Sequence, residues 1–176
     1  MTIEHDAARE AVMTLGLLTP DAIPTIARLI NANFNEHPRA VATRYRKEGD
    51  QIDDAAKKTL GIRKNGFLSK ASYSEITNLG LASPLTAHET TLLRATFTVA
   101  RHNRVAQGEA TREHLGTKFA GYLHETLHRE CSACNELNGA ITDAAGAAIM
   151  PPATCVPGCF ANYDIRAKID WLADID

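Results

Sequence analysis

Residues 20–34 read PDAIPTIARLINANF, and this stretch indicates the fold class most clearly. Its apolar side chains recur at the spacing of one buried helix face: Ile23, Ile26, Leu29, Ile30 and Phe34. Thr19 followed by Pro20 is typical of a helix start, because the first turn does not need the N–H that proline lacks. His37-Pro38 predicts the end of the helix, since a residue before proline disfavours helical geometry.

The same kind of pattern extends outward in both directions. Short helices are expected at 4–15, before Gly16, and at 39–48 and 52–60. A long helix is expected to follow Thr86-x-x-Glu89, which has the form of a capping box, and to break at Gly108.

A further helix is expected from Thr111, with an apolar stripe of Leu115, Phe119, Leu123 and Leu127. Another is expected after Phe160. No run of alternating strand residues stands out, so the sequence predicts a mainly α fold with an irregular C-terminal segment. We expect a helical part at 1–123 and a metal-binding part at 124–176 packed on it, within one folded unit.

Composition places few limits on function. The chain has 176 residues, 44% hydrophobic and 23% charged, with a formal net charge of −2, which is ordinary for a soluble globular protein. No apolar run approaches the roughly 20 residues of a membrane helix, and the first residues lack the basic start and apolar core of a signal peptide. A cytoplasmic protein without a membrane partner is therefore expected, and there paired cysteines more often bind metal than form disulfides.

Basic residues gather in the segment 39–70, which holds nine of the 19 lysines and arginines. A solvated helix surface would explain this, and so would a docking surface for nucleic acid or an acidic partner. The stretch DDAAKKTLGIRKNGFLSKA at 53–71 has a loose helix-turn-helix pattern. Asn65-Gly66 is typical of a turn where the second helix would begin, which favours two short helices joined by a loop.

All four cysteines lie close to the C-terminus as two pairs, Cys131-x-x-Cys134 and Cys155-x-x-x-Cys159. Twenty residues separate the pairs, which suits a structural zinc site with four thiolate ligands. A cysteine pair, a loop and a second pair before a helix resemble the layout of a treble-clef zinc finger. Two disulfides remain an alternative, whereas the cysteine spacing matches neither common ferredoxin pattern.

A different metal site is suggested by residues 124–128, HETLH. On a helix, His124 and His128 would project from one side, four residues apart. This arrangement resembles the zinc helix of the zincin metallopeptidases. The resemblance implies that His124 and His128 bind Zn²⁺ and that Glu125 acts as general base in hydrolysis of a peptide or protein substrate. Asp143 is the candidate for the third ligand.

The cysteine pairs and the HETLH motif could also contribute ligands to one shared metal site. His128, Cys131 and Cys134 follow the spacing H-x-x-C-x-x-C, so one ion could take ligands from both sets. The sequence thus predicts a zinc-binding protein and leaves two functions open. One is a zinc-dependent hydrolase of metallopeptidase type, and the other is a non-enzymatic binding module with a structural zinc site.

Overall fold

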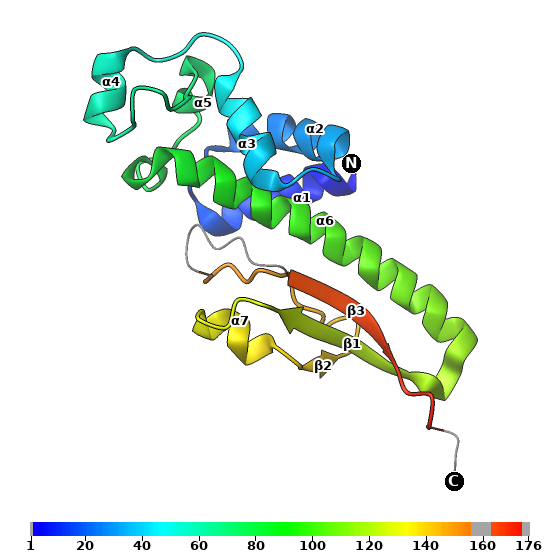
Figure 1. Ribbon diagram of the computed structural model, residues 1–176. Helices are drawn as coiled ribbons and strands as arrows, with labels where there is room; N and C mark the ends of the chain where they lie inside the picture. The colour runs from blue at the N-terminus through cyan, green and yellow to red at the C-terminus, as the bar shows by residue number, and fades with distance from the viewer. Residues whose placement is uncertain (1, 156–162, 174–176) are drawn as a thin grey trace. The chain divides into compact units, whose positions relative to one another are not determined.

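The computed structural model describes residues 2–155 and 163–173, and the fold is mainly α as expected (Figure 1). Within these residues lie seven α-helices: α1 (Ile3–Leu15), α2 (Ile23–Asn33), α3 (Pro38–Lys47), α4 (Asp54–Thr59), α5 (Lys70–Ser74), α6 (Pro84–Leu115) and α7 (Ser132–Leu137). Three strands accompany them: β1 (Phe119–Thr126), β2 (Ile141–Thr142) and β3 (Tyr163–Ile169). None of the helices in the described part combines the length and apolar character needed to cross a membrane.

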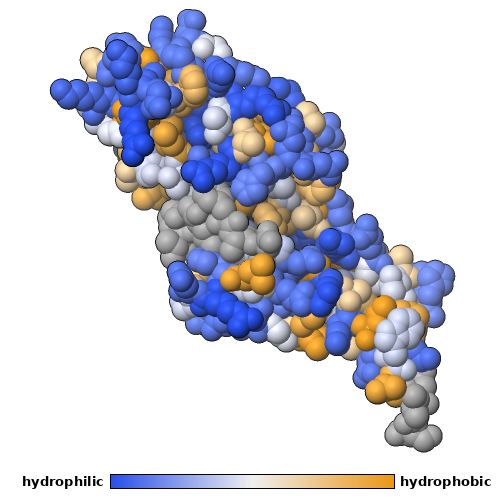
Figure 2. All heavy atoms as spheres, viewed as in Figure 1, coloured by the Kyte–Doolittle hydropathy of each residue, from blue (hydrophilic) through white to orange (hydrophobic). Residues whose placement is uncertain are grey.

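The chain divides into two compact units, residues 1–96 and 97–176, and the division falls inside α6. The boundary expected from the ligand positions, between residues 123 and 124, lies after the end of this helix. Hydrophilic residues cover most of the face drawn in Figure 2, and apolar side chains appear there in small groups.

The first unit contains the helix expected from residues 20–34. Ile23, Ile26, Leu29 and Ile30 are buried on α2, whereas Phe34 at its C-terminal end is 37% exposed. Helix α1 ends at Gly16, which adopts the left-handed conformation (φ 62°) that glycine reaches without a Cβ penalty. Helices α1 and α2 pack against each other, and each buries the apolar side chains of one face.

The segment 53–71 forms two short helices and a loop rather than a helix-turn-helix. Helix α4 begins after its N-cap Asp53, whose carboxylate accepts a hydrogen bond from the amide of Ala56. Residues 60–69 form a loop with turns at 60–61 and 64–65, and α5 begins after Ser69 and has only five residues. No helix in this part of the described chain is long enough to act as a recognition helix.

The second unit is built on an antiparallel sheet in the order β2-β1-β3 (Figure 1). Its core contains Tyr122 of β1, Ile165 of β3 and Ala147. The C-terminal half of α6 packs on this sheet, since the Tyr122 hydroxyl donates a hydrogen bond to the carbonyl of Val105 at 2.9 Å.

Gly108 does not break α6, contrary to expectation. A Cβ at this position would lie 2.4 Å from Cε1 of Tyr122, which is shorter than the contact distance between non-bonded carbon atoms. The glycine therefore allows the tyrosine ring to reach the helix backbone, and α6 continues to Leu115.

The predictions of one helix from Thr111 to Leu127 and another after Phe160 are wrong where the structure has strands. Residues 111–115 belong to the end of α6. Residues 119–126 form β1, with Tyr122, His124 and Thr126 buried at alternate positions. Residues 163–169 form β3, in which apolar and polar side chains also alternate. An alternating pattern suits a sheet with one covered face, and it outweighs the four-residue spacing of leucines that suggested a helix.

Candidate metal centre

Four potential metal ligands lie together in the second unit, and their ligand atoms are all within 4.8 Å of one another. We call them the His–Cys cluster: His128, Cys131, Cys134 and Cys155. They include the H-x-x-C-x-x-C combination considered above, completed by one cysteine of the second pair. Imidazole and thiolate are the ligands that Zn²⁺ takes in structural sites.

The first three members are held by the end of β1 and the start of α7. The hydroxyl of Thr126, the last residue of β1, accepts a hydrogen bond from the amide of His128 at 3.0 Å. Cys131 is the N-cap residue of α7 and has an extended backbone, and Cys134 lies in the first turn of that helix. The turn and the short helix thus direct an imidazole and two thiols to one point.

Cys155 comes from a separate loop and brings its sulfur to the same place. Its Sγ lies 3.6 Å from that of Cys134 and 3.9 Å from that of Cys131. Sulfurs that bind one Zn²⁺ tetrahedrally at about 2.3 Å lie roughly 3.8 Å apart, whereas disulfide sulfurs lie about 2.05 Å apart. The separations from the Cys155 sulfur are therefore too long for a disulfide and match thiolates that share one ion.

Tyr163, the first residue of β3, contacts the His–Cys cluster. This contact was not expected from the sequence. Its hydroxyl oxygen lies 3.3 Å from Sγ of Cys155 and 3.9 Å from Sγ of Cys134. A hydroxyl in this position donates to thiolates once they carry charge. The alternation of Tyr163, Ile165 and Ala167 along the sequence was the signal that could have placed this ring on a strand.

Burial affects the protonation of the cluster. Cys131 and Cys134 are buried beside Met150 and Tyr163. Removal from water raises the pKa of the Cys134 thiol, because the thiolate is poorly solvated there. A bound cation would reverse this preference, since metal-bound cysteines are deprotonated.

The other predicted site residues of the HETLH motif lie outside the His–Cys cluster. His124 is buried on β1, where its Nε2 lies 2.9 Å from Oγ1 of Thr142, and burial lowers its pKa. Glu125 pairs with Arg166 of β3 at 2.8 Å. Because residues 119–126 form a strand, successive side chains point to opposite faces, and the helix that the zincin motif requires is not present there.

The two remaining predicted ligands, Asp143 and Cys159, are not part of the His–Cys cluster that the structure describes. Asp143, the expected third ligand, accepts a hydrogen bond from the amide of Gly146 at 2.7 Å and is not among the clustered ligand atoms. Cys159, the fourth expected thiolate, lies outside the described residues.

The basic segment 39–70 is partly neutralised within the first unit. Five of its nine basic side chains form ion pairs or hydrogen bonds: Arg39, Arg44, Arg46, Lys57 and Lys64. The buried guanidinium of Arg46, for example, lies 3.0 Å from Glu89. Binding of nucleic acid or an acidic partner by this segment stays a prediction.

No family model matches the chain, and no curated protein or solved structure is significantly similar to it.

Proposed function

We propose that the His–Cys cluster binds one Zn²⁺ ion and that this ion has a structural role in the second unit. The observation that carries the proposal is the convergence of four ligand atoms within 4.8 Å, from a turn, a short helix and a distant loop. Three thiolates and one imidazole are a common ligand set of structural zinc sites.

Zinc suits this set better than other metals. Magnesium and calcium require oxygen ligands, and none of the four residues supplies one. Iron–sulfur clusters are usually held by four thiolates, whereas one position here is an imidazole. Soft thiolates combined with imidazole in one compact group favour Zn²⁺.

A structural role is favoured over hydrolysis by the number of ligands. Four protein ligands fill a tetrahedral ion, whereas a catalytic zinc keeps one position open for water. Glu125, the residue expected as general base, is ion-paired with Arg166. The metallopeptidase alternative therefore has less support than a centre that stabilises the fold.

The ion would join three short parts of the second unit: the turn after β1, helix α7 and the loop that carries Cys155. Helix α7 has six residues, and β2 has two. Such short elements bury little apolar surface, so a shared metal ion would contribute to holding them in place. Zinc would thus fix the turn after β1, α7 and the loop carrying Cys155 to one another.

Metal content tests the proposal. The purified full chain is expected to contain one zinc ion, measured by elemental analysis and by native mass spectrometry. Cys134→Ser is expected to lower the zinc content strongly and to reduce the melting temperature, because it removes a buried ligand. His128→Ala tests the imidazole ligand. Its matched control is His102→Ala, which changes an exposed histidine of α6.

The control should retain one zinc ion, and His128→Ala should bind zinc more weakly in competition with a chromogenic chelator. A wild-type chain that contains no zinc and does not bind added zinc would refute the proposal.

A further inference from the structure

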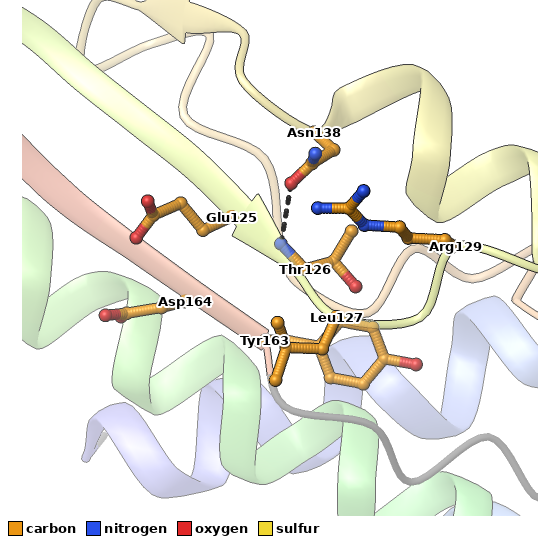
Figure 3. Close-up of a pocket in the computed structure, with 7 residues that line it drawn as sticks. All are labelled: Glu125, Thr126, Leu127, Arg129, Asn138, Tyr163 and Asp164. Carbon is orange, nitrogen blue, oxygen red and sulfur yellow. Dashed lines mark hydrogen bonds between the residues drawn. The ribbon is translucent and has the colours of Figure 1, made fainter.

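A cavity of about 380 Å³ lies in the second unit (Figure 3). Seven residues line it: Glu125, Thr126, Leu127, Arg129, Asn138, Tyr163 and Asp164. Its volume falls in the lower part of the range for small-molecule sites, roughly 300–1,000 Å³. The cavity and the cluster share the turn that contains His128 and the ring of Tyr163.

One wall of the cavity carries two carboxylates. Glu125 and Asp164 are opposite each other in the β1–β3 pairing, so both side chains project from the same face of the sheet. Figure 3 shows the two groups extending in the same direction from neighbouring strands. Like charges directly opposite each other destabilise a sheet, and a cation bound between them would relieve this repulsion.

The neighbouring arginines compensate these carboxylates only in part. Arg166 lies 2.8 Å from Glu125, and Arg104 forms a longer ion pair with Asp164 at 3.7 Å. Oδ1 of Asp164 also accepts a hydrogen bond from the amide of Ile165 at 2.8 Å. The carboxylate side chains of Glu125 and Asp164 remain 42% and 45% exposed. This wall therefore suits an ammonium group of a ligand.

Another part of the lining carries hydrogen-bond donors. The side-chain oxygen of Asn138 accepts a hydrogen bond from the amide of Thr126 at 3.0 Å, which fixes the orientation of the side-chain NH₂ group, a hydrogen-bond donor. The guanidinium of Arg129 has no ion pair or hydrogen bond with any residue in 2–155 or 163–173, and Figure 3 shows it directed toward Asn138. Two such donors match a carboxylate.

Leu127 adds an apolar surface to this lining. It is 70% exposed, among the most exposed large apolar side chains of the described chain. Exposure of leucine to water is unfavourable, and contact with an apolar ligand group would reduce it.

We infer that this cavity binds a small zwitterion of the α-amino-acid class with an apolar side chain. The ammonium group lies against Glu125 and Asp164, the carboxylate binds Arg129 and Asn138, and the side chain covers Leu127. The inference rests on the proposed function in one respect, because zinc bound to His128 holds the turn that carries Leu127 and Arg129.

Three related probes test the ligand chemistry on the zinc-loaded full chain by calorimetric titration. L-Leucine has both charges, L-leucinamide lacks the carboxylate, and N-acetyl-L-leucine lacks the ammonium. L-Leucine is expected to bind saturably, and each capped analogue should bind at least about tenfold more weakly. Equal binding of all three, or no leucine binding up to roughly 10 mM, would overturn the inference.

Variants locate the site. Arg129→Gln and, separately, Asp164→Asn are expected to weaken leucine binding about tenfold. Arg112→Gln, at an exposed arginine of α6 in the same unit, is the matched control and should bind leucine as the wild type does. Unchanged binding in both cavity variants contradicts the assignment.

Zinc content is measured in every sample so that the two proposals fail separately. A zinc-loaded chain that does not bind leucine refutes the cavity and leaves the metal centre intact. A chain without zinc refutes the metal centre, and the same titration of that chain then decides whether the cavity binds leucine.

Discussion

At the scale of single residues, the distances between sulfur atoms distinguish a metal centre from a disulfide. The Sγ atom of Cys155 lies 3.6 and 3.9 Å from those of Cys134 and Cys131. These values lie on either side of the roughly 3.8 Å expected for thiolates around one zinc ion. Tyr163 adds a hydroxyl at 3.3 Å from the Cys155 sulfur, which is the place of an outer hydrogen-bond donor to a bound thiolate.

Tyr163→Phe is expected to weaken zinc binding about 10- to 100-fold without changing the stoichiometry, because loss of an outer hydrogen bond makes the thiolate ligand less stable. Competition with a chelator measures this affinity. Tyr73→Phe, at an exposed tyrosine of the first unit, serves as the control. Zinc affinity equal to that of the wild type would show that the hydroxyl does not support the metal.

His88 makes the stability of the first unit depend on pH. It is fully buried on α6, near the guanidinium of Arg46, and its Nδ1 lies 3.2 Å from the carbonyl of Pro84. Burial lowers its pKa from 6.5 to about 4. The unfolded chain thus takes up a proton that the folded chain excludes, and stability decreases as the pH falls through this interval.

The expected loss between pH 6.5 and pH 4 is about 3 kcal/mol, from roughly 1.4 kcal/mol per pKa unit. Chemical unfolding of the wild type and of His88→Gln at several pH values measures it, with His102→Gln as the exposed control. The His88 variant should show a flatter decline above pH 5, where carboxylates contribute less. A decline identical to that of the wild type would contradict this role.

At the scale of helices and strands, the sequence predicted the first unit well and the second poorly. The expected helices at 4–15, 20–34, 39–48 and 52–60 correspond to α1, α2, α3 and α4. Their signals are local: helical spacing, proline starts and a glycine end.

In the second unit, the apolar residues Leu115, Phe119, Leu123 and Leu127 recur every four positions and suggested a helix. Burial instead follows Tyr122, His124 and Thr126, and Leu127 is 70% exposed. Pairing with β3 and cover from α6 decide this element, and neither is visible in local spacing.

Gly108→Ala tests how α6 and β1 are connected. In an exposed helix this change would stabilise by roughly 1 kcal/mol. Here a Cβ would meet the Tyr122 ring, so we expect a net destabilisation of about 1–3 kcal/mol. Thermal or chemical unfolding measures the change, with Gln107→Ala at the neighbouring exposed position as control. A more stable Gly108 variant would mean that the ring does not contact this helix as described.

At the scale of the whole molecule, the metal centre lies within the second of two units. The sequence alone located it near the C-terminus, because all four cysteines and the HETLH motif lie there. It also offered His128, Cys131 and Cys134 as one set. It did not rank this set above a four-thiolate or a zincin site, since that choice depends on β1 ending at Thr126 and on the path of the loop to Cys155.

X-ray absorption spectroscopy at the zinc edge of the metal-loaded full chain tests the central claim most directly. Three sulfur ligands at about 2.3 Å and one nitrogen ligand at about 2.0–2.1 Å are expected. Four sulfur ligands would assign Cys159 to the ion in place of His128, and a shell of nitrogen and oxygen alone would contradict the cysteine centre altogether.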